Sequence, residues 1–139
     1  MLDDIGSDRT PEPLGAPRTA TGRRLGHQQK EFLLLLAFTL TRHNYAGRAV
    51  KLYRALSAID PEDAYVWRCL AHAALLAGNA EESLDACERA LRIEKNTDHR
   101  DKIELIRGKA LWKLGRSLEA RQCVEAALGL HQGGPRDAK

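Results

Sequence analysis

The sequence predicts an all-α protein, and three observations support that fold class. Apolar residues recur at spacings of three and four between residues 29 and 131. No segment alternates apolar and polar residues for long enough to form a β-strand. Alanine and leucine dominate while aromatic residues reach only 5%, which suits thin helices packed through small side chains better than a β-sandwich. The length of 139 residues suits a single domain.

Six helices are expected, separated by five short breaks that contain glycine, proline or polar residues. The breaks fall at Asn44, Asp60-Pro61, Gly78-Asn79, Asn96 to Asp98, and Gly115-Arg116. In chain order, the first two expected helices flank Asn44, the middle two flank Gly78-Asn79, and the last two flank Gly115-Arg116. The helices therefore form three helix–turn–helix pairs.

The two ends of the chain are expected to lie outside the fold. Residues 1–28 hold three of the five prolines and four of the eleven glycines. They carry too few apolar side chains to offset the entropy of ordering them, so we expect a flexible leader there. The run Gly133-Gly134-Pro135 ends the fold near His131, and residues 132–139 are expected to form a flexible tail.

An internal repeat supports the three pairs. Shifting the sequence by 34 residues aligns Ala37 with Ala71, and a further shift of 37 aligns Ala71 with Gly108. Small residues recur in this way where two helices must approach closely. The three extra residues of the second interval fall in the polar stretch Lys95 to Asp101, where we expect a loop to absorb them.

The repeat resembles the tetratricopeptide repeat, a helix–turn–helix unit of about 34 residues. The middle repeat matches it best, through Trp67 and the run AGNAEESLDACERALRIEKN. The resemblance implies three repeats within residues 29–131, at about 30–63, 64–100 and 101–131, stacked into a short right-handed α-solenoid. No clear C-terminal capping helix follows the third repeat.

Without a capping helix, the last repeat has no neighbour to cover its apolar residues. These residues are Leu118, Val124, Leu128 and Leu130. A repeat array ordinarily ends in a helix with a polar outer face. We expect another protein to supply the missing surface, with self-association of the isolated chain as the alternative.

The repeat frame implies a concave groove lined by the first helix of each repeat. Ten residues are expected to line it and bind a partner: Leu34, Phe38, Arg42, Tyr65, Arg68, His72, Leu105, Lys109, Trp112 and Lys113. An apolar and aromatic strip edged by cations suits an amphipathic helix or an extended peptide with acidic residues. Three further residues face the same way, and we interpret them as packing between helices: Leu35, Cys69 and Ile106.

The segment that opens the first repeat narrows the resemblance. The run HQQKEFLLLLAFTLTRHNYAGRAVKLYRALSAIDPED is similar to the start of small chaperones of bacterial type III secretion, closest to the Y-class export-apparatus chaperone. The matching residues are Gln28, Gln29, Glu31, Phe32, Leu33, Leu34 and Leu35. The resemblance implies a cytoplasmic bacterial chaperone that holds one small exported protein with amphipathic helices, in an equimolar complex, and helps deliver it to the export gate. Translocator chaperones, needle-subunit chaperones and a generic repeat adaptor outside secretion remain open.

No enzymatic, metal-binding or cofactor-binding motif stands out. The five histidines are scattered, and no HExxH, CxxC or glycine-rich phosphate loop occurs. Cys69 and His72 lie three residues apart, as a nucleophile and its base would. A buried thiol beside a groove-lining imidazole is the simpler interpretation, and no third metal ligand converges on the two residues. We therefore expect a protein that is not an enzyme and that holds no cofactor or metal.

Charge, cysteine content and hydropathy favour a cytoplasmic protein without nucleic-acid partners. The net charge of +3 is spread along the chain and forms no concentrated basic block. The three cysteines lie in apolar segments, as in a protein of a reducing compartment. The longest apolar run, Phe32 to Phe38, is far shorter than the roughly 20 residues of a membrane span. The chain opens with acidic residues instead of a secretory signal.

Overall fold

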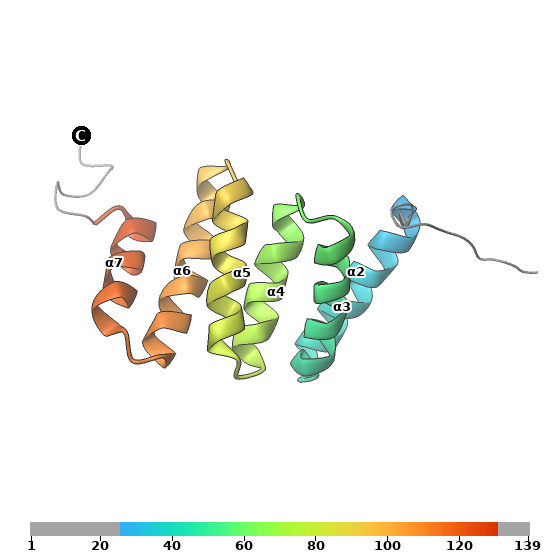
Figure 1. The fold of residues 1–139 in the computed structure, drawn as a ribbon, viewed down its shortest axis with the longest axis horizontal. Coiled ribbons are helices and arrows are strands. Elements are labelled where there is room, and N and C mark those ends of the chain that lie inside the picture. Colours follow the sequence, from blue (N-terminus) through green and yellow to red (C-terminus); the bar gives the residue numbers. More distant parts are fainter. Residues whose placement is uncertain (1–25, 131–139) are drawn as a thin grey trace, which may run out of the picture. The chain divides into compact units, whose positions relative to one another are not determined.

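The computed structural model describes residues 26–130, and within that range it contains six α-helices and no β-strand. This confirms the predicted all-α fold class. The helices, named as in Figure 1, are α2 (His27–Arg42), α3 (Ala46–Ile59), α4 (Ala64–Leu76), α5 (Ala80–Ile93), α6 (Thr97–Lys113) and α7 (Ser117–Leu128). Most of the predicted leader, residues 1–25, and the whole predicted tail lie outside the described residues.

The chain divides into two compact units, Met1–Phe32 and Leu33–Lys139. The described part of the first unit contains the beginning of α2. There the side-chain oxygen of Gln29 accepts a hydrogen bond from the Gly26 backbone N–H at 2.9 Å, and this satisfies a donor at the start of the helix. The helix therefore begins at His27, two residues before the predicted start of the folded domain at residue 29.

In the second unit, each helix from α3 onward packs on the next one. The contacts join α3 to α4, α4 to α5, α5 to α6 and α6 to α7, and α6 also contacts α4. Figure 1 shows α4 to α7 in this order. The core is built largely from alanine, with full burial of Ala49, Ala71, Ala73, Ala74, Ala90 and Ala110. These small side chains let neighbouring helices approach closely, as the composition predicts.

The ends of the helices recur at the spacing of the sequence repeat. Leu76 ends α4 34 residues after Arg42 ends α2, and Lys113 ends α6 37 residues after Leu76. The turn after each of these helices contains one residue with positive φ: Asn44 (68°), Gly78 (89°) and Gly115 (81°). Glycine and asparagine tolerate this left-handed conformation better than other residues do. The breaks predicted at these three positions are confirmed, and the turns join the pairs α2–α3, α4–α5 and α6–α7.

The break predicted at Asn96 to Asp98 is wrong in its second half, because α6 begins at Thr97. Asn96 caps the helix by accepting a hydrogen bond from the His99 backbone N–H at 3.1 Å. The three extra residues of this interval do not form the predicted loop. They lengthen α6 to 17 residues, against 13 in α4, which is about one additional turn. Asparagine and aspartate, which favour turns, also favour the start of a helix.

A single arginine joins the end of α5 to the beginning of α6. Arg100 Nη1 donates hydrogen bonds to the carbonyl oxygens of Leu91 at 2.7 Å and Glu94 at 2.8 Å. The carbonyl groups in the last turn of a helix receive no hydrogen bond from within that helix, so they need a donor from outside it. The Arg100 guanidinium therefore fixes the short connection between the second and third helix pairs.

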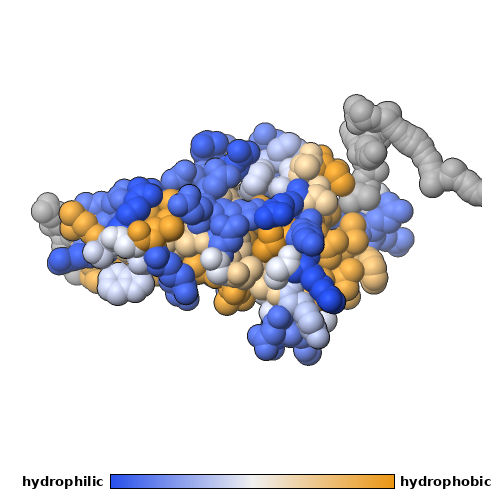
Figure 2. All heavy atoms as spheres, turned by 60° about the horizontal axis from the view of Figure 1, so that its bottom comes forward, coloured by the Kyte–Doolittle hydropathy of each residue, from blue (hydrophilic) through white to orange (hydrophobic). Residues whose placement is uncertain are grey.

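Several large apolar side chains of the second unit are exposed. On the face viewed in Figure 2, apolar groups reach the surface in patches between hydrophilic ones. The exposed large apolar side chains of this unit include Leu35, Phe38, Tyr65, Trp112, Leu118 and Leu128. Contiguous apolar surface of this kind marks places where a protein contacts other molecules.

Candidate functional site

A pocket of about 280 Å³ opens within the second unit, between residues of α2, α3, α4 and α6. We call it the α2/α4/α6 pocket, because nine of its ten residues come from these three helices. Its lining residues are Phe38, Thr41, Arg42, Tyr53, Tyr65, Arg68, Cys69, His72, Lys102 and Ile106. Five residues of the predicted partner-binding groove meet here: Phe38, Arg42, Tyr65, Arg68 and His72.

The interior of this pocket is apolar and aromatic. Tyr53 is only 3% exposed, and Cys69 and Ile106 are half-buried. Phe38 and Tyr65 are exposed by 51% and 46%. Aromatic rings left this open on a folded protein offer a surface against which another apolar group can pack.

Each of the two open aromatic rings is paired with an arginine of its own helix. The guanidinium carbon of Arg42 lies 5.7 Å from the centre of the Phe38 ring, and that of Arg68 lies 5.3 Å from the centre of the Tyr65 ring. These cation–π contacts hold the charges close to the rings. Lys102 of α6 adds a third cation. None of the ten lining residues is acidic, so the pocket carries positive charge.

One polar atom of the pocket is buried without an acceptor. Arg68 Nη1 makes no hydrogen bond to the residues that the structure describes. A buried guanidinium N–H that lacks an acceptor is costly. A carboxylate or backbone carbonyl of a bound partner would satisfy it with a charge-assisted hydrogen bond. Arg68 is therefore the position in the pocket where a bound acceptor stabilises most.

Burial disfavours the charged forms of the thiol and the imidazole in this pocket. Burial raises the pKa of the Cys69 thiol, and burial together with Cys69 raises the pKa of Tyr53. Partial burial and the nearby Lys109 ammonium lower the pKa of His72. A thiol with a raised pKa forms little thiolate near neutral pH and is a weak nucleophile. Burial therefore favours the neutral thiol of Cys69.

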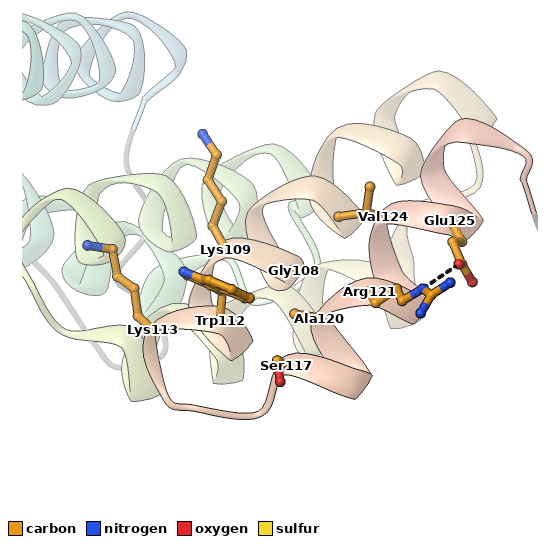
Figure 3. Close-up of a pocket in the computed structure, with 9 residues that line it drawn as sticks. All are labelled: Gly108, Lys109, Trp112, Lys113, Ser117, Ala120, Arg121, Val124 and Glu125. Atoms are coloured by element: carbon orange, nitrogen blue, oxygen red, sulfur yellow. Dashed lines mark hydrogen bonds and ion pairs between the residues drawn. The ribbon is translucent and has the colours of Figure 1, made fainter.

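A second pocket, of about 460 Å³, lies between α6 and α7 (Figure 3). We call it the α6/α7 groove. Its lining residues are Gly108, Lys109, Trp112, Lys113, Ser117, Ala120, Arg121, Val124 and Glu125. Three of the predicted partner-binding residues line this groove and not the α2/α4/α6 pocket: Lys109, Trp112 and Lys113.

Small residues bring the two helices of the groove close together. A Cβ atom added at Gly108 would lie 3.3 Å from both the Ala120 carbonyl oxygen and Val124 Cγ2. Figure 3 shows the Trp112 indole extending toward Ala120. Trp112 is 68% exposed, so the groove offers a broad apolar wall to whatever enters it.

The remaining predicted residues lie outside both pockets. Leu34 is half-buried, and Leu105 is 38% exposed. Leu35, which we interpreted as packing between helices, is 61% exposed, so that interpretation is wrong for Leu35. The reason is that α2 has no preceding helix pair among residues 26–130 to cover it. The other two residues of that interpretation, Cys69 and Ile106, are half-buried and line the α2/α4/α6 pocket.

Sequence reasoning missed the contribution of the second helix of the first and third pairs. Tyr53 of α3 lines the first pocket, and Ala120 and Arg121 of α7 line the second. The repeat frame assigns the groove to the first helices alone, which is why these residues were not included. A signal was present, because the alignment places Tyr53 with Cys87 and Val124, and all three are apolar or weakly polar.

Comparison with known proteins leaves the site to be interpreted from its own chemistry. No protein-family model matches the chain, and no curated protein sequence matches it. Within residues 26–130, no three His, Cys, Asp or Glu side chains form a group that could hold a metal ion. No helix in the described part of the chain is long and apolar enough to cross a membrane.

Proposed function

We propose that the protein is a non-catalytic chaperone that holds an amphipathic helix of a small partner protein in the α2/α4/α6 pocket. The three helix pairs act as tetratricopeptide repeats. By the resemblance of its first repeat, the partner is a small exported protein of a bacterial type III secretion system. The chaperone holds that protein in the cytoplasm and helps deliver it to the export gate.

The observation that carries this proposal is the pairing of open aromatic rings with cations in one pocket. Phe38 and Tyr65 would pack against the apolar face of the bound helix. Arg42 and Lys102 would contact acidic residues along its edge. Arg68 Nη1 supplies a buried donor without an acceptor, so a partner that brings a carboxylate or carbonyl is favoured over an entirely apolar one.

The dimensions of the pocket favour anchor side chains of a protein over an enclosed small molecule. Pockets for small molecules commonly measure about 300–1,000 Å³ and bury most of the ligand. This pocket measures about 280 Å³ and two of its aromatic residues are about half exposed. A chaperone needs no further chemistry, because covering the apolar face of an exported helix is enough to prevent its aggregation.

Photocrosslinking in the native cell tests the proposal. A benzoylphenylalanine residue replaces Phe38 in one variant and Ile59 in a control, since Ile59 is 40% exposed and lines neither pocket. We expect the Phe38 variant to crosslink to one small protein that copurifies in an equimolar complex, and the control to give no such product. A mixed set of folded proteins would favour a generic adaptor, and the same products from both variants would contradict a groove site.

A charge substitution then tests the role of the buried donor. Arg68→Ala is expected to weaken binding of the captured partner by about tenfold or more, as loss of a charge-assisted hydrogen bond does. Arg89→Ala is the matched control, because the Arg89 guanidinium also lies over an aromatic ring, 5.0 Å from the centre of Trp67, but lines neither pocket. Titration calorimetry with the purified partner gives both affinities, and equal losses would contradict the assignment.

A further inference from the structure

Two exposed residues of the α6/α7 groove have buried counterparts in the preceding pair. In the repeat alignment, Trp112 takes the position of Leu75, and Val124 that of Cys87. Leu75 and Cys87 are exposed by 7% and 0%, whereas Trp112 and Val124 are exposed by 68% and 38%. The cause lies in the packing, because α6 contacts both α4 and α5, which carry Leu75 and Cys87. No helix among residues 26–130 takes the equivalent place on α6 and α7.

The helix α2 shows the opposite situation, because it exposes positions that are buried in α4 and α6. Thr39 is exposed, but it aligns with Ala73 and Ala110, which are both 0% exposed. Leu35 is 61% exposed, but it aligns with the half-buried Ile106. The helices α4 and α6 each follow another helix pair, and α2 follows none within the described range.

We propose that α2 of one copy of this chain docks in the α6/α7 groove of another copy, so that copies join head to tail. Leu35 and Thr39 would then gain the cover that their counterparts in α6 already have. Trp112 and Val124 would pack on the incoming helix. The contact uses α2 of one copy and the groove of the other. The first copy therefore keeps a free groove and the second keeps a free α2, so further copies can add at both ends.

The charges at this junction are complementary. Within the chain, Arg54 of α3 donates two hydrogen bonds to Glu82 of α5, both at 2.6 Å. The repeat alignment places Glu125 at the position of Arg54, and Arg48 at the position of Glu82. Glu125 accepts a hydrogen bond from Arg121 of its own helix at 2.9 Å, and at the junction it would also face Arg48 of the next copy. This would pair opposite charges in reversed order, whereas the same positions of α5 and α7 within one chain hold Glu88 and Glu119.

A second copy is a better occupant of the groove than the tail of the same chain. Residues 131–139 include Gly133-Gly134-Pro135, and glycine and proline disfavour a helix. A second copy offers α2, a helix of 16 residues in the same repeat frame as α4 and α6. The junction would continue the contacts that successive pairs of one chain already make.

Sedimentation velocity of the full chain over a concentration series tests the proposal. The wild-type chain is expected to form species larger than a dimer as its concentration rises. Leu35→Arg blocks α2, and Val124→Arg blocks the groove, so each variant alone is expected to remain monomeric. Both residues are exposed, and thermal melts followed by circular dichroism verify that the variants fold.

Mixing the two variants separates a head-to-tail junction from other contacts. Leu35→Arg retains its groove and Val124→Arg retains its α2, so the equimolar mixture should form a dimer and nothing larger. The proposal is overturned by a wild-type chain that stays monomeric up to about 1 mM. It is equally overturned by a mixture that fails to associate, or by a wild-type assembly that stops at the dimer, which indicates a two-fold symmetric contact.

A charge reversal tests the register of the junction. Glu125→Arg is expected to weaken association by about threefold to tenfold, because it places two arginines opposite each other. Adding Arg48→Glu to the same chain should restore the wild-type association, since every junction then carries the reversed pair. Association that is weakened and not restored overturns this register. None of these readouts needs a partner protein, so they are independent of whether the α2/α4/α6 pocket binds one.

Discussion

The α4–α5 and α6–α7 pairs follow the same repeat alignment, yet equivalent positions are buried in the first pair and exposed in the second. In α4–α5, Ser83 Oγ donates a hydrogen bond to the Ala71 carbonyl oxygen at 2.8 Å in a fully buried position. Burial also raises the pKa of the nearby Cys87 thiol to about 12. In α6–α7 the equivalent positions are Ala120 and Val124, and Val124 is 38% exposed. The difference teaches that neighbouring helices, more than residue type, decide which positions of this frame form the core.

The largest expected effect comes from truncating the same position in the two pairs. Leu75→Ala removes a side chain that is 7% exposed, and it should lower the free energy of unfolding by about 2–4 kcal/mol. Trp112→Ala removes one that is 68% exposed, and it should change that free energy by less than about 0.5 kcal/mol. Urea unfolding followed by circular dichroism at low protein concentration measures both. Equal losses would mean that Trp112 is covered in solution.

A smaller loss is expected from enlarging the contact between α6 and α7. Gly108→Leu places a side chain where even a Cβ atom would lie 3.3 Å from the Ala120 carbonyl oxygen. We expect the free energy of unfolding to fall by about 1–3 kcal/mol. Gly47→Ala is the control, because no heavy atom lies within 4 Å of its added Cβ. That variant should gain up to about 1 kcal/mol from helix propensity. Thermal unfolding of the two proteins gives the comparison, and a stable Gly108→Leu variant would contradict the close approach.

A still smaller loss is expected at the turn between α6 and α7. Gly115 has a φ of 81°, and a Cβ atom added there would have no heavy atom within 4 Å. Gly115→Ala should therefore cost about 1 kcal/mol of stability through backbone strain alone. Gly115→Asn should cost less, because Asn44 adopts the same conformation in the first pair with a φ of 68°. Urea midpoints rank the three proteins, and an alanine variant as stable as the wild type would contradict the strain.

The smallest effect concerns acidification of the α2/α4/α6 pocket. Partial burial and Lys109 lower the pKa of His72 below its ordinary value of 6.5 in the folded chain. The unfolded chain then binds more protons over this range, so stability is fully present above about pH 6.5 and falls as the pH drops through the folded pKa. His72→Gln should remove that part of the pH dependence. Unfolding midpoints between pH 7.5 and pH 5 measure it, and identical profiles would contradict the assignment.

The fold was predictable because its signals are local. Asn44, Gly78 and Gly115 occur at the repeat spacing, and each tolerates the left-handed turn that ends the first helix of its pair. The extra turn of α6 was not predictable on the same grounds. Asn96 and Asp98 suit both a loop and a helix start, and the helix is favoured by the Asn96 cap together with the hydrogen bonds of Arg100 to the end of α5.

The candidate site was predictable in part. The aromatic and arginine pairs of α2 and α4 follow from the helical period, because residues three or four apart share a face. The division of the expected groove was not predictable. Lys109 and Trp112 lie on the part of α6 that faces α7, and the width of the space between those helices depends on the close approach at Gly108. Periodicity places residues on a face but does not say how far the facing helix stands.

The hydrogen bonds of Arg100 also bear on how the second unit opens. They tie α6 to the end of α5 through two carbonyl groups, so we expect these two helices to exchange their amide hydrogens as one cooperative unit. The helix α7 is the last helix of the described residues and makes its main contact with α6, so it should open at a lower free energy than α5 and α6. Hydrogen exchange should be faster at α7 than at α5 and α6, and anything that fills the α6/α7 groove would slow the exchange of α7 first.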